Sequence, residues 1–157
     1  MKRRGLIEFH NLSFGVTSAI MTSLVLVIGL GSAENNMALI TALLIIAIAE
    51  NISDSFGIHI YQESKHIVPK EAKKTTIISF IAKMLTTFVF ILFVVCLPMN
   101  LAIIFSIIFG IIILTIISCI ISKIKKISPY HSIISHLTVA IILMALGFVL
   151  KYIILNV

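Results

Sequence analysis

Hydrophobic positions along the chain fall into five long stretches separated by short polar segments. The stretches cover about 13–33, 37–60, 75–97, 101–122 and 132–155. Each is close to the roughly 20 residues that a helix needs to cross a bilayer. None shows the alternation of apolar and polar residues that marks a strand of a membrane barrel. The pattern predicts an all-α integral membrane protein with five transmembrane helices.

The segments between the stretches carry residues that interrupt helices. They contain Glu34-Asn35-Asn36, Pro69, Pro98 with Asn100, and Ser128-Pro129. Polar clusters and prolines of this kind mark turns. These joints are short, so we expect residues 1–157 to form a single five-helix membrane domain with no soluble domain.

Composition excludes the main soluble classes. Of the 157 residues, 60% are hydrophobic and 11% are charged, and the mean hydropathy is +1.20. Soluble proteins are roughly half apolar and about a quarter charged, and a small domain cannot bury the excess. A water-soluble enzyme and a disordered chain are both excluded. The formal net charge of +6 lies in loops rather than on one face, so we expect no nucleic-acid partner.

The basic residues predict the orientation in the membrane. If the chain crosses five times, nearly all of them flank the same side: Lys2, Arg3, Arg4, Lys65, Lys70, Lys73, Lys74, Lys123, Lys125 and Lys126. Because positive residues favour the cytoplasmic side, we expect a cytoplasmic N-terminus and an outside C-terminus. Gly31-Ser32-Ala33 looks like a signal-peptide cleavage site, but the apolar stretch before it is too long. We therefore expect a retained first helix.

Three charged residues lie inside the predicted spans. Glu50 and Asp54 are four residues apart in the second stretch, which places both carboxylates on one helix face, about 6 Å apart along the axis. Such a pair is costly in a membrane unless a bound cation, a transported proton or a cationic side chain compensates it. Lys83 in the third stretch could pair with Asp54 or with Glu50. One carboxylate would still be left over, and this surplus is the main indication of a cation or proton site.

Other polar residues in the spans give weaker indications. Ser18 and its neighbours in the first stretch could supply hydroxyl oxygens to a cation path. Gly15 and Ala19 have the small-xxx-small spacing that lets two helices approach closely. Asn51, Ser55 and His59 form a polar stripe on the second helix.

The histidines do not form a recognisable metal motif in the sequence. His59 and Glu63 are four apart and are interpreted as a helix-end pair. His66, His131 and His136 are interpreted as interfacial side chains. The chain lacks a zinc motif, a phosphate-binding loop and a hydrolytic constellation. We therefore expect no enzymatic activity, no permanently bound cofactor, and no ATP-driven pumping by this chain alone.

The first two stretches resemble the vacuolar iron transporter family. The matching segments are Gly15-Val16-Thr17-Ser18-Ala19-Ile20, Gly29-Leu30-Gly31-Ser32-Ala33, Ala49-Glu50-Asn51-Ile52-Ser53-Asp54-Ser55-Phe56-Gly57-Ile58, Ser64-Lys65 and Leu97-Pro98. The resemblance is specific over about residues 11–65 and only architectural after that. It implies a homodimer, to which Gly15 and Ala19 add weak support, that moves ferrous iron or another divalent metal such as manganese out of the cytosol in exchange for protons. It also implies the cytoplasmic membrane of a prokaryote or a vacuolar-type membrane of a eukaryote.

The resemblance assigns metal-pathway roles to individual residues. Glu50 falls on the family's acidic or amide position of the second helix, and Asp54 falls on its aspartate. Ser18 stands where the family has a metal-binding aspartate, and Ile58 stands where it has a methionine. Met21, one turn from Ser18, is a substitute sulfur ligand. The Glu-rich cytoplasmic insertion is absent, with only Glu63, His66 and Glu71 in the segment from Gln62 to Thr75.

Two other functions are compatible with the same residues. The chain could be a transport-inactive membrane scaffold or partner-binding protein, with Lys83 neutralising one carboxylate and a proton neutralising the other. It could also provide a pathway for protons or a small solute.

Overall fold

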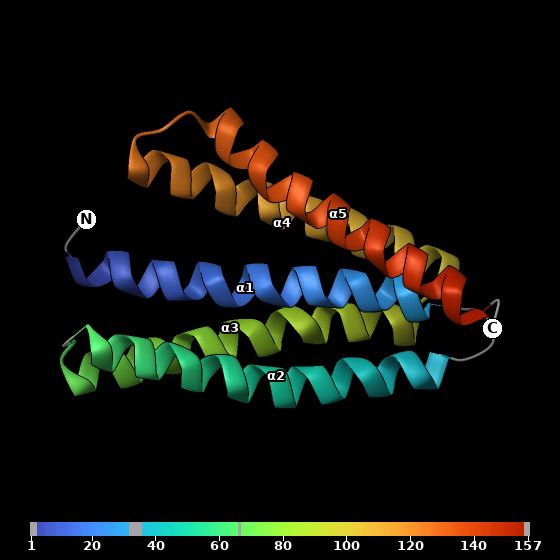
Figure 1. Ribbon diagram of the computed structural model, residues 1–157, viewed down its shortest axis with the longest axis horizontal. Helices are drawn as coiled ribbons and strands as arrows, with labels where there is room; N and C mark the ends of the chain where they lie inside the picture. The colour runs from blue at the N-terminus through green and yellow to red at the C-terminus, as the bar shows by residue number, and fades with distance from the viewer. Residues whose placement is uncertain (1–2, 32–35, 66, 156–157) are drawn as a thin grey trace.

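The computed structural model describes residues 3–31, 36–65 and 67–155, and within these ranges the chain forms α-helices and no β-strand (Figure 1). The helices are α1 (Arg3–Leu30), α2 (Asn36–Ser64), α3 (Pro69–Cys96), α4 (Met99–Lys125) and α5 (Pro129–Leu155). All five are long and apolar enough to cross a membrane. The protein is therefore an all-α integral membrane protein with five spans, as the apolar pattern predicts.

The helices extend beyond the apolar stretches at most ends. The first begins at Arg3 rather than near residue 13, and it ends at Leu30 rather than at residue 33. Much of the expected linker from Gln62 to Thr75 is helical, because polar and charged residues there favour a helix as well as a loop. Ser32, Ala33, the Glu34-Asn35 part of the predicted turn and His66 lie outside the described residues.

Prolines set three of the helix starts. Pro69 and Pro129 are the first residues of α3 and α5, and Pro98 immediately precedes α4. Proline suits these positions because the first turn of a helix has no intrahelical acceptor for its N–H groups. At its other end, α4 stops at Lys126, which has a left-handed backbone and donates its N–H to the carbonyl of Ser122.

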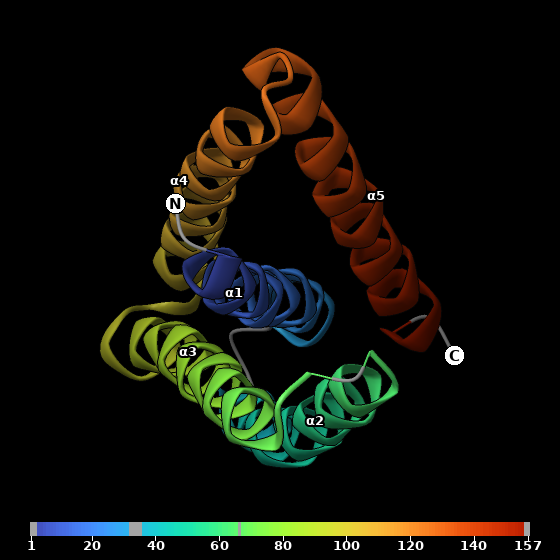
Figure 2. The ribbon, with the colours of Figure 1, turned by 90° about the vertical axis from the view of Figure 1, so that its left-hand side faces the viewer.

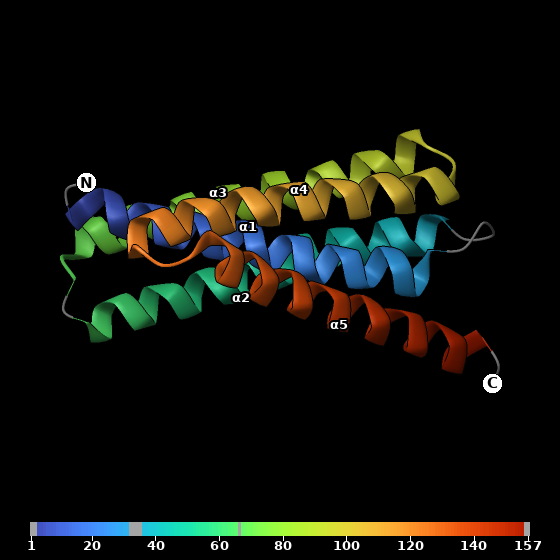
Figure 3. The same cartoon turned by 90° about the horizontal axis from the view of Figure 1, so that it is seen from above.

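The first helix occupies the centre of the molecule. It packs against each of the other four helices, with the α2–α3 pair on one side and the α4–α5 pair on the other (Figure 2). The α4–α5 pair is joined at the end where the chain begins, and the two helices diverge toward the opposite end (Figures 2 and 3). At the joined end the pair also leans away from α1 (Figure 1).

The apolar core lies between these helices. Ile20, Leu24 and Val27 of α1 are buried against residues of the other helices, among them Phe90 and Leu114. The rings of Phe90 and Phe109 meet edge to face with centroids 5.6 Å apart, which joins α3 to α4. The outward side chains of α2 and α5 are mostly apolar, as expected for helices that face lipid.

At Gly15, α1 and α3 approach each other closely. A Cβ atom at this position would lie 2.6 Å from the carbonyl oxygen of Ser79, which is backbone and cannot move aside. Ala19, one turn on, is 1% exposed. The small-xxx-small pair therefore packs α1 within its own chain, and its support for a dimer is withdrawn.

We expect Gly15→Ala to lower the stability of the fold by about 1–3 kcal/mol, because an added methyl group has no space there. Gly57→Ala is the matched control, since a Cβ at Gly57 meets nothing within 4 Å. Thermal unfolding in detergent compares the two variants. Equal unfolding temperatures would show that the contact between Gly15 and Ser79 does not constrain the packing.

Candidate functional site

Glu50, Asp54 and Lys83 meet near the middle of α2 and α3, and we call them the charged triad. Lys83 Nζ lies 2.6 Å from Asp54 Oδ2 and 3.0 Å from Glu50 Oε1. It also donates to Ser18 Oγ of α1 over 3.1 Å. An ammonium group has three N–H donors, and these three acceptors match that number. Both pairings that the sequence predicts for Lys83 are therefore present together.

Two hydroxyl groups of α1 complete the cluster. Thr22 donates to Glu50 Oε1 over 3.1 Å. Ser18 Oγ lies 3.3 Å from Asp54 Oδ2 and 3.5 Å from Glu50 Oε1. Ser18 and Thr22 are one turn apart, so both reach the carboxylates from the same face of α1. The cluster thus presents oxygen atoms from two carboxylates and two hydroxyls around one ammonium group.

The charges of the triad do not balance. Two carboxylates face one lysine, which leaves one negative charge when all three groups are ionised. A membrane interior screens such a charge poorly, so an additional cation or proton is favoured at the cluster. The surplus that the sequence predicts is therefore retained in the folded protein.

Access to the cluster differs between its members. The Lys83 side chain is 2% exposed, whereas the side chains of Glu50 and Asp54 are 30% and 29% exposed. Their open side lies along α2 next to Ala49, Ser53 and Gly57, all exposed and spaced one turn apart. The carboxylates can therefore be reached from this face of α2, while the ammonium group lies behind them.

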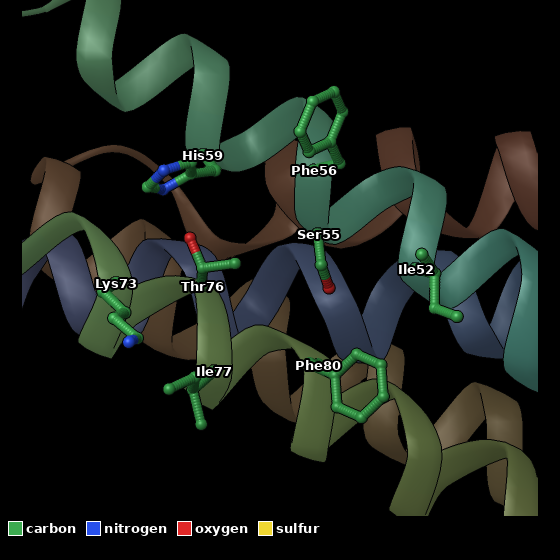
Figure 4. Close-up of a pocket in the computed structure, with 8 residues that line it drawn as sticks. All are labelled: Ile52, Ser55, Phe56, His59, Lys73, Thr76, Ile77 and Phe80. Carbon is green, nitrogen blue, oxygen red and sulfur yellow. The ribbon is translucent and has the colours of Figure 1, made fainter.

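The polar stripe expected on α2 is divided between two places. Asn51 is 1% exposed and donates from Nδ2 to the carbonyl of Phe80 over 3.0 Å, which fixes α2 to α3 beside the triad. Ser55 and His59 instead line a separate cavity of about 510 Å³ between α2 and α3 (Figure 4). His59 Nε2 lies 3.4 Å from Glu63 Oε1, which confirms the predicted helix-end pair.

The structure brings together most of the residues that the sequence singles out. Glu50, Asp54, Ser18 and Lys83 converge in one cluster. Met21 packs against the apolar core of the bundle, so its side chain is part of the helix packing. Sequence reasoning gave no specific role to Thr22, although its position one turn after Ser18 is the signal that identifies it.

The ligand set for a metal is small. Among the side chains that the structure describes, no group of three or more His, Cys, Asp or Glu residues converges in a way that could hold a metal ion. A cation at the triad would be bound by two carboxylates, with hydroxyl oxygens and water completing its shell. Such a set suits transient binding of a hard cation better than permanent retention.

Comparison with known proteins gives no assignment. The chain matches no family model, and no curated protein or solved structure is significantly similar to it. The resemblance to vacuolar iron transporters stays a prediction from short segments. Function is therefore inferred from the geometry and charge of the triad.

Proposed function

We propose that the protein is a transporter of divalent transition-metal cations, iron or manganese, which it exports from the cytosol by proton exchange. The observation that carries this proposal is the unbalanced triad, in which two partly exposed carboxylates share one buried lysine near the middle of the spanning helices. Ionisable groups at this depth are costly and usually mark a transport path.

Charge balance indicates how many protons would be exchanged for each metal ion. The unloaded cluster is neutral when Lys83 is protonated and one of the two carboxylates carries a proton. The loaded cluster is neutral when both carboxylates bind a divalent cation and Lys83 has lost its proton. A divalent cation would therefore replace two protons, and both states would be electrically neutral inside the membrane. Coupling of this kind follows because metal ligands must be deprotonated to bind.

The chemistry of the donors narrows the substrate. All candidate donor atoms are oxygens of Glu50, Asp54, Ser18 and Thr22. Carboxylate and hydroxyl oxygens suit hard cations such as manganese, whereas softer metals prefer sulfur; iron is proposed from the resemblance to vacuolar iron transporters. Protons that move into the cytosol down their gradient would drive the metal out of the cytosol, the side on which we expect the N-terminus. The membrane would be the cytoplasmic membrane of a prokaryote or a vacuolar-type membrane of a eukaryote.

The exposed face of α2 supports assembly as a homodimer. Exposed carboxylates are costly against lipid, and the neighbouring small residues Ala49 and Ser53 would let another helix approach closely. A second copy packed there would cover Glu50 and Asp54 and add oxygen donors to the bound cation.

A transport-inactive scaffold is the second candidate, and one observation favours it. All three donors of Lys83 are used by acceptors of the cluster, which suits a purely structural ion pair. In that case a permanent proton on one carboxylate removes the surplus, and the face of α2 binds only a protein partner.

Flux measurements distinguish the two candidates. Purified protein in proteoliposomes is expected to move Mn²⁺ and Fe²⁺, and Glu50→Gln and Asp54→Asn should each lower the flux at least about tenfold, since each removes a charged ligand. Glu63→Gln is the matched control, because Glu63 lies on the same helix outside the triad. No flux in the wild type would favour the scaffold. Unchanged flux in both triad variants would exclude this site.

Thr22→Val is expected to weaken the apparent affinity for the metal about tenfold without preventing folding, because it removes the hydroxyl that Glu50 accepts from. Thr115→Val is the control, since the Thr115 hydroxyl bonds only within α4, to the carbonyl of Ile111. Both are measured as the concentration dependence of Mn²⁺ flux. Equal affinities in the two variants would show that Thr22 does not shape the site.

A further inference from the structure

A second polar site, separate from the triad, lies at the end of the molecule where α4 joins α5. A cavity of about 380 Å³ opens between the first turns of α1, the last turns of α4 and the first turns of α5. This is the end at which the α4–α5 pair leans away from α1 (Figure 1). The basic loops place the same end at the cytoplasmic surface of the membrane.

The cavity has a positive polar side and an apolar side. Lys125, His10, His131 and His136 contribute the basic groups, and none of the described residues that line it is acidic. Phe9, Ile121 and Ile124 form much of the apolar side. The first N–H groups of α5 lie at the same end, and a helix N-terminus favours an anion. The combination suits a ligand with a negative group and a hydrocarbon part.

Ser13 supplies the observation that points to a bound ligand. The residue is 4% exposed and lines the cavity, yet its hydroxyl has no hydrogen-bond partner among the residues that the structure describes. A buried hydroxyl without a partner costs roughly 1–3 kcal/mol, so such groups are rare unless something else satisfies them. A ligand oxygen in the cavity would accept this hydrogen bond.

The neighbouring His136 is anchored to α4 through one ring nitrogen. Ser118 Oγ lies 2.6 Å from the carbonyl oxygen of Leu114 and 2.7 Å from His136 Nδ1. The other ring nitrogen, Nε2, then remains for a ligand. A protonated imidazole would donate from it to an anionic oxygen.

We propose that this cavity binds the phosphate group of an anionic phospholipid of the cytoplasmic leaflet. The phosphate oxygens would accept from Ser13 and pair with Lys125 and His136, while the glycerol and acyl carbons would lie along Phe9, Ile121 and Ile124. The apolar side favours a lipid over a free phosphate, since an inorganic ion would leave these side chains without a partner. The site is separate from the triad and does not depend on transport.

Native mass spectrometry of the full-length protein in detergent tests the proposal. The probes are phosphatidic acid, phosphatidylcholine and inorganic phosphate. We expect the wild type to retain phosphatidic acid and to lose phosphatidylcholine, with no displacement by millimolar phosphate. Ser13→Ala and Lys125→Gln should each weaken retention of phosphatidic acid about tenfold.

Two controls separate a site from general effects. Ser106→Ala removes another buried hydroxyl that has no partner among the described residues and does not line the cavity. Lys65→Gln removes a charge at the turn between α2 and α3, which also lies outside the cavity. Both should retain phosphatidic acid as the wild type does. Equal retention by all four variants would overturn the site. Displacement by inorganic phosphate would overturn the assignment to a lipid, and loss of retention in both controls would show that retention does not depend on this cavity.

Discussion

Replacing Lys83 with methionine is expected to lower the stability of the folded protein by about 3–5 kcal/mol, the largest effect of any single substitution in the triad. The side chain is buried and supplies the cation that both Glu50 and Asp54 contact. Methionine fills a similar volume but leaves two carboxylates four residues apart with no counter-charge. Thermal unfolding in detergent, with and without Mn²⁺, measures the loss.

A triple variant provides the control for this prediction. Glu50→Gln and Asp54→Asn, combined with Lys83→Met, remove all three charges together, and replacing a whole buried ion cluster is often neutral. We therefore expect the triple variant to regain most of the wild-type stability. Mn²⁺ should stabilise the Lys83→Met protein, in which the carboxylates are unpaired, and should not affect the triple variant. If Lys83→Met unfolded at the wild-type temperature, the triad would not be a compensated charge cluster.

Glu50→Gln is expected to change stability and transport in opposite directions. The substitution removes the surplus charge and leaves Asp54 paired with Lys83 at 2.6 Å, so stability should stay the same or rise by about 1 kcal/mol. Transport should nevertheless be abolished, because a single carboxylate leaves the loaded cluster with a net positive charge even when Lys83 has lost its proton. Functional sites commonly show this conflict between stability and activity.

The same comparison applies to the other carboxylate. Asp54→Asn leaves the longer contact from Lys83 to Glu50, so we expect it to lose transport and to be less stable than Glu50→Gln. Unfolding temperatures and Mn²⁺ fluxes are measured on the same preparations. A parallel loss of stability and flux in both variants would indicate that the carboxylates maintain the fold and do not serve as ligands.

The fold could be predicted largely from the apolar pattern. Five stretches of membrane-spanning length leave little choice of architecture, and prolines 69, 98 and 129 mark three of the helix starts. The positions of the other ends could not be predicted, because hydropathy detects the part of a helix that lies in the bilayer. Residues such as Glu71 and Lys73 continue α3 without adding apolar signal.

The charged site could be predicted in part. The four-residue spacing of Glu50 and Asp54 defines a shared helix face, and charge balance identifies Lys83 as their partner. The contribution of Thr22 depends on how α1 is rotated against α2, and that rotation is set by packing at Gly15 and by the apolar core. The cavity beside Ser13 depends on the lean of the α4–α5 pair, for which the sequence carries no readable signal.

Proton release on metal binding is the most direct test of the exchange proposed for the triad. Calorimetric titration of the wild-type protein with Mn²⁺, repeated in buffers of different ionisation enthalpy, gives the number of protons released per ion. We expect about two protons per Mn²⁺ in the wild type and no specific binding by the variant that lacks all three charges. Binding by the wild type without proton release, or equal binding by both proteins, would contradict an exchange at Glu50, Asp54 and Lys83.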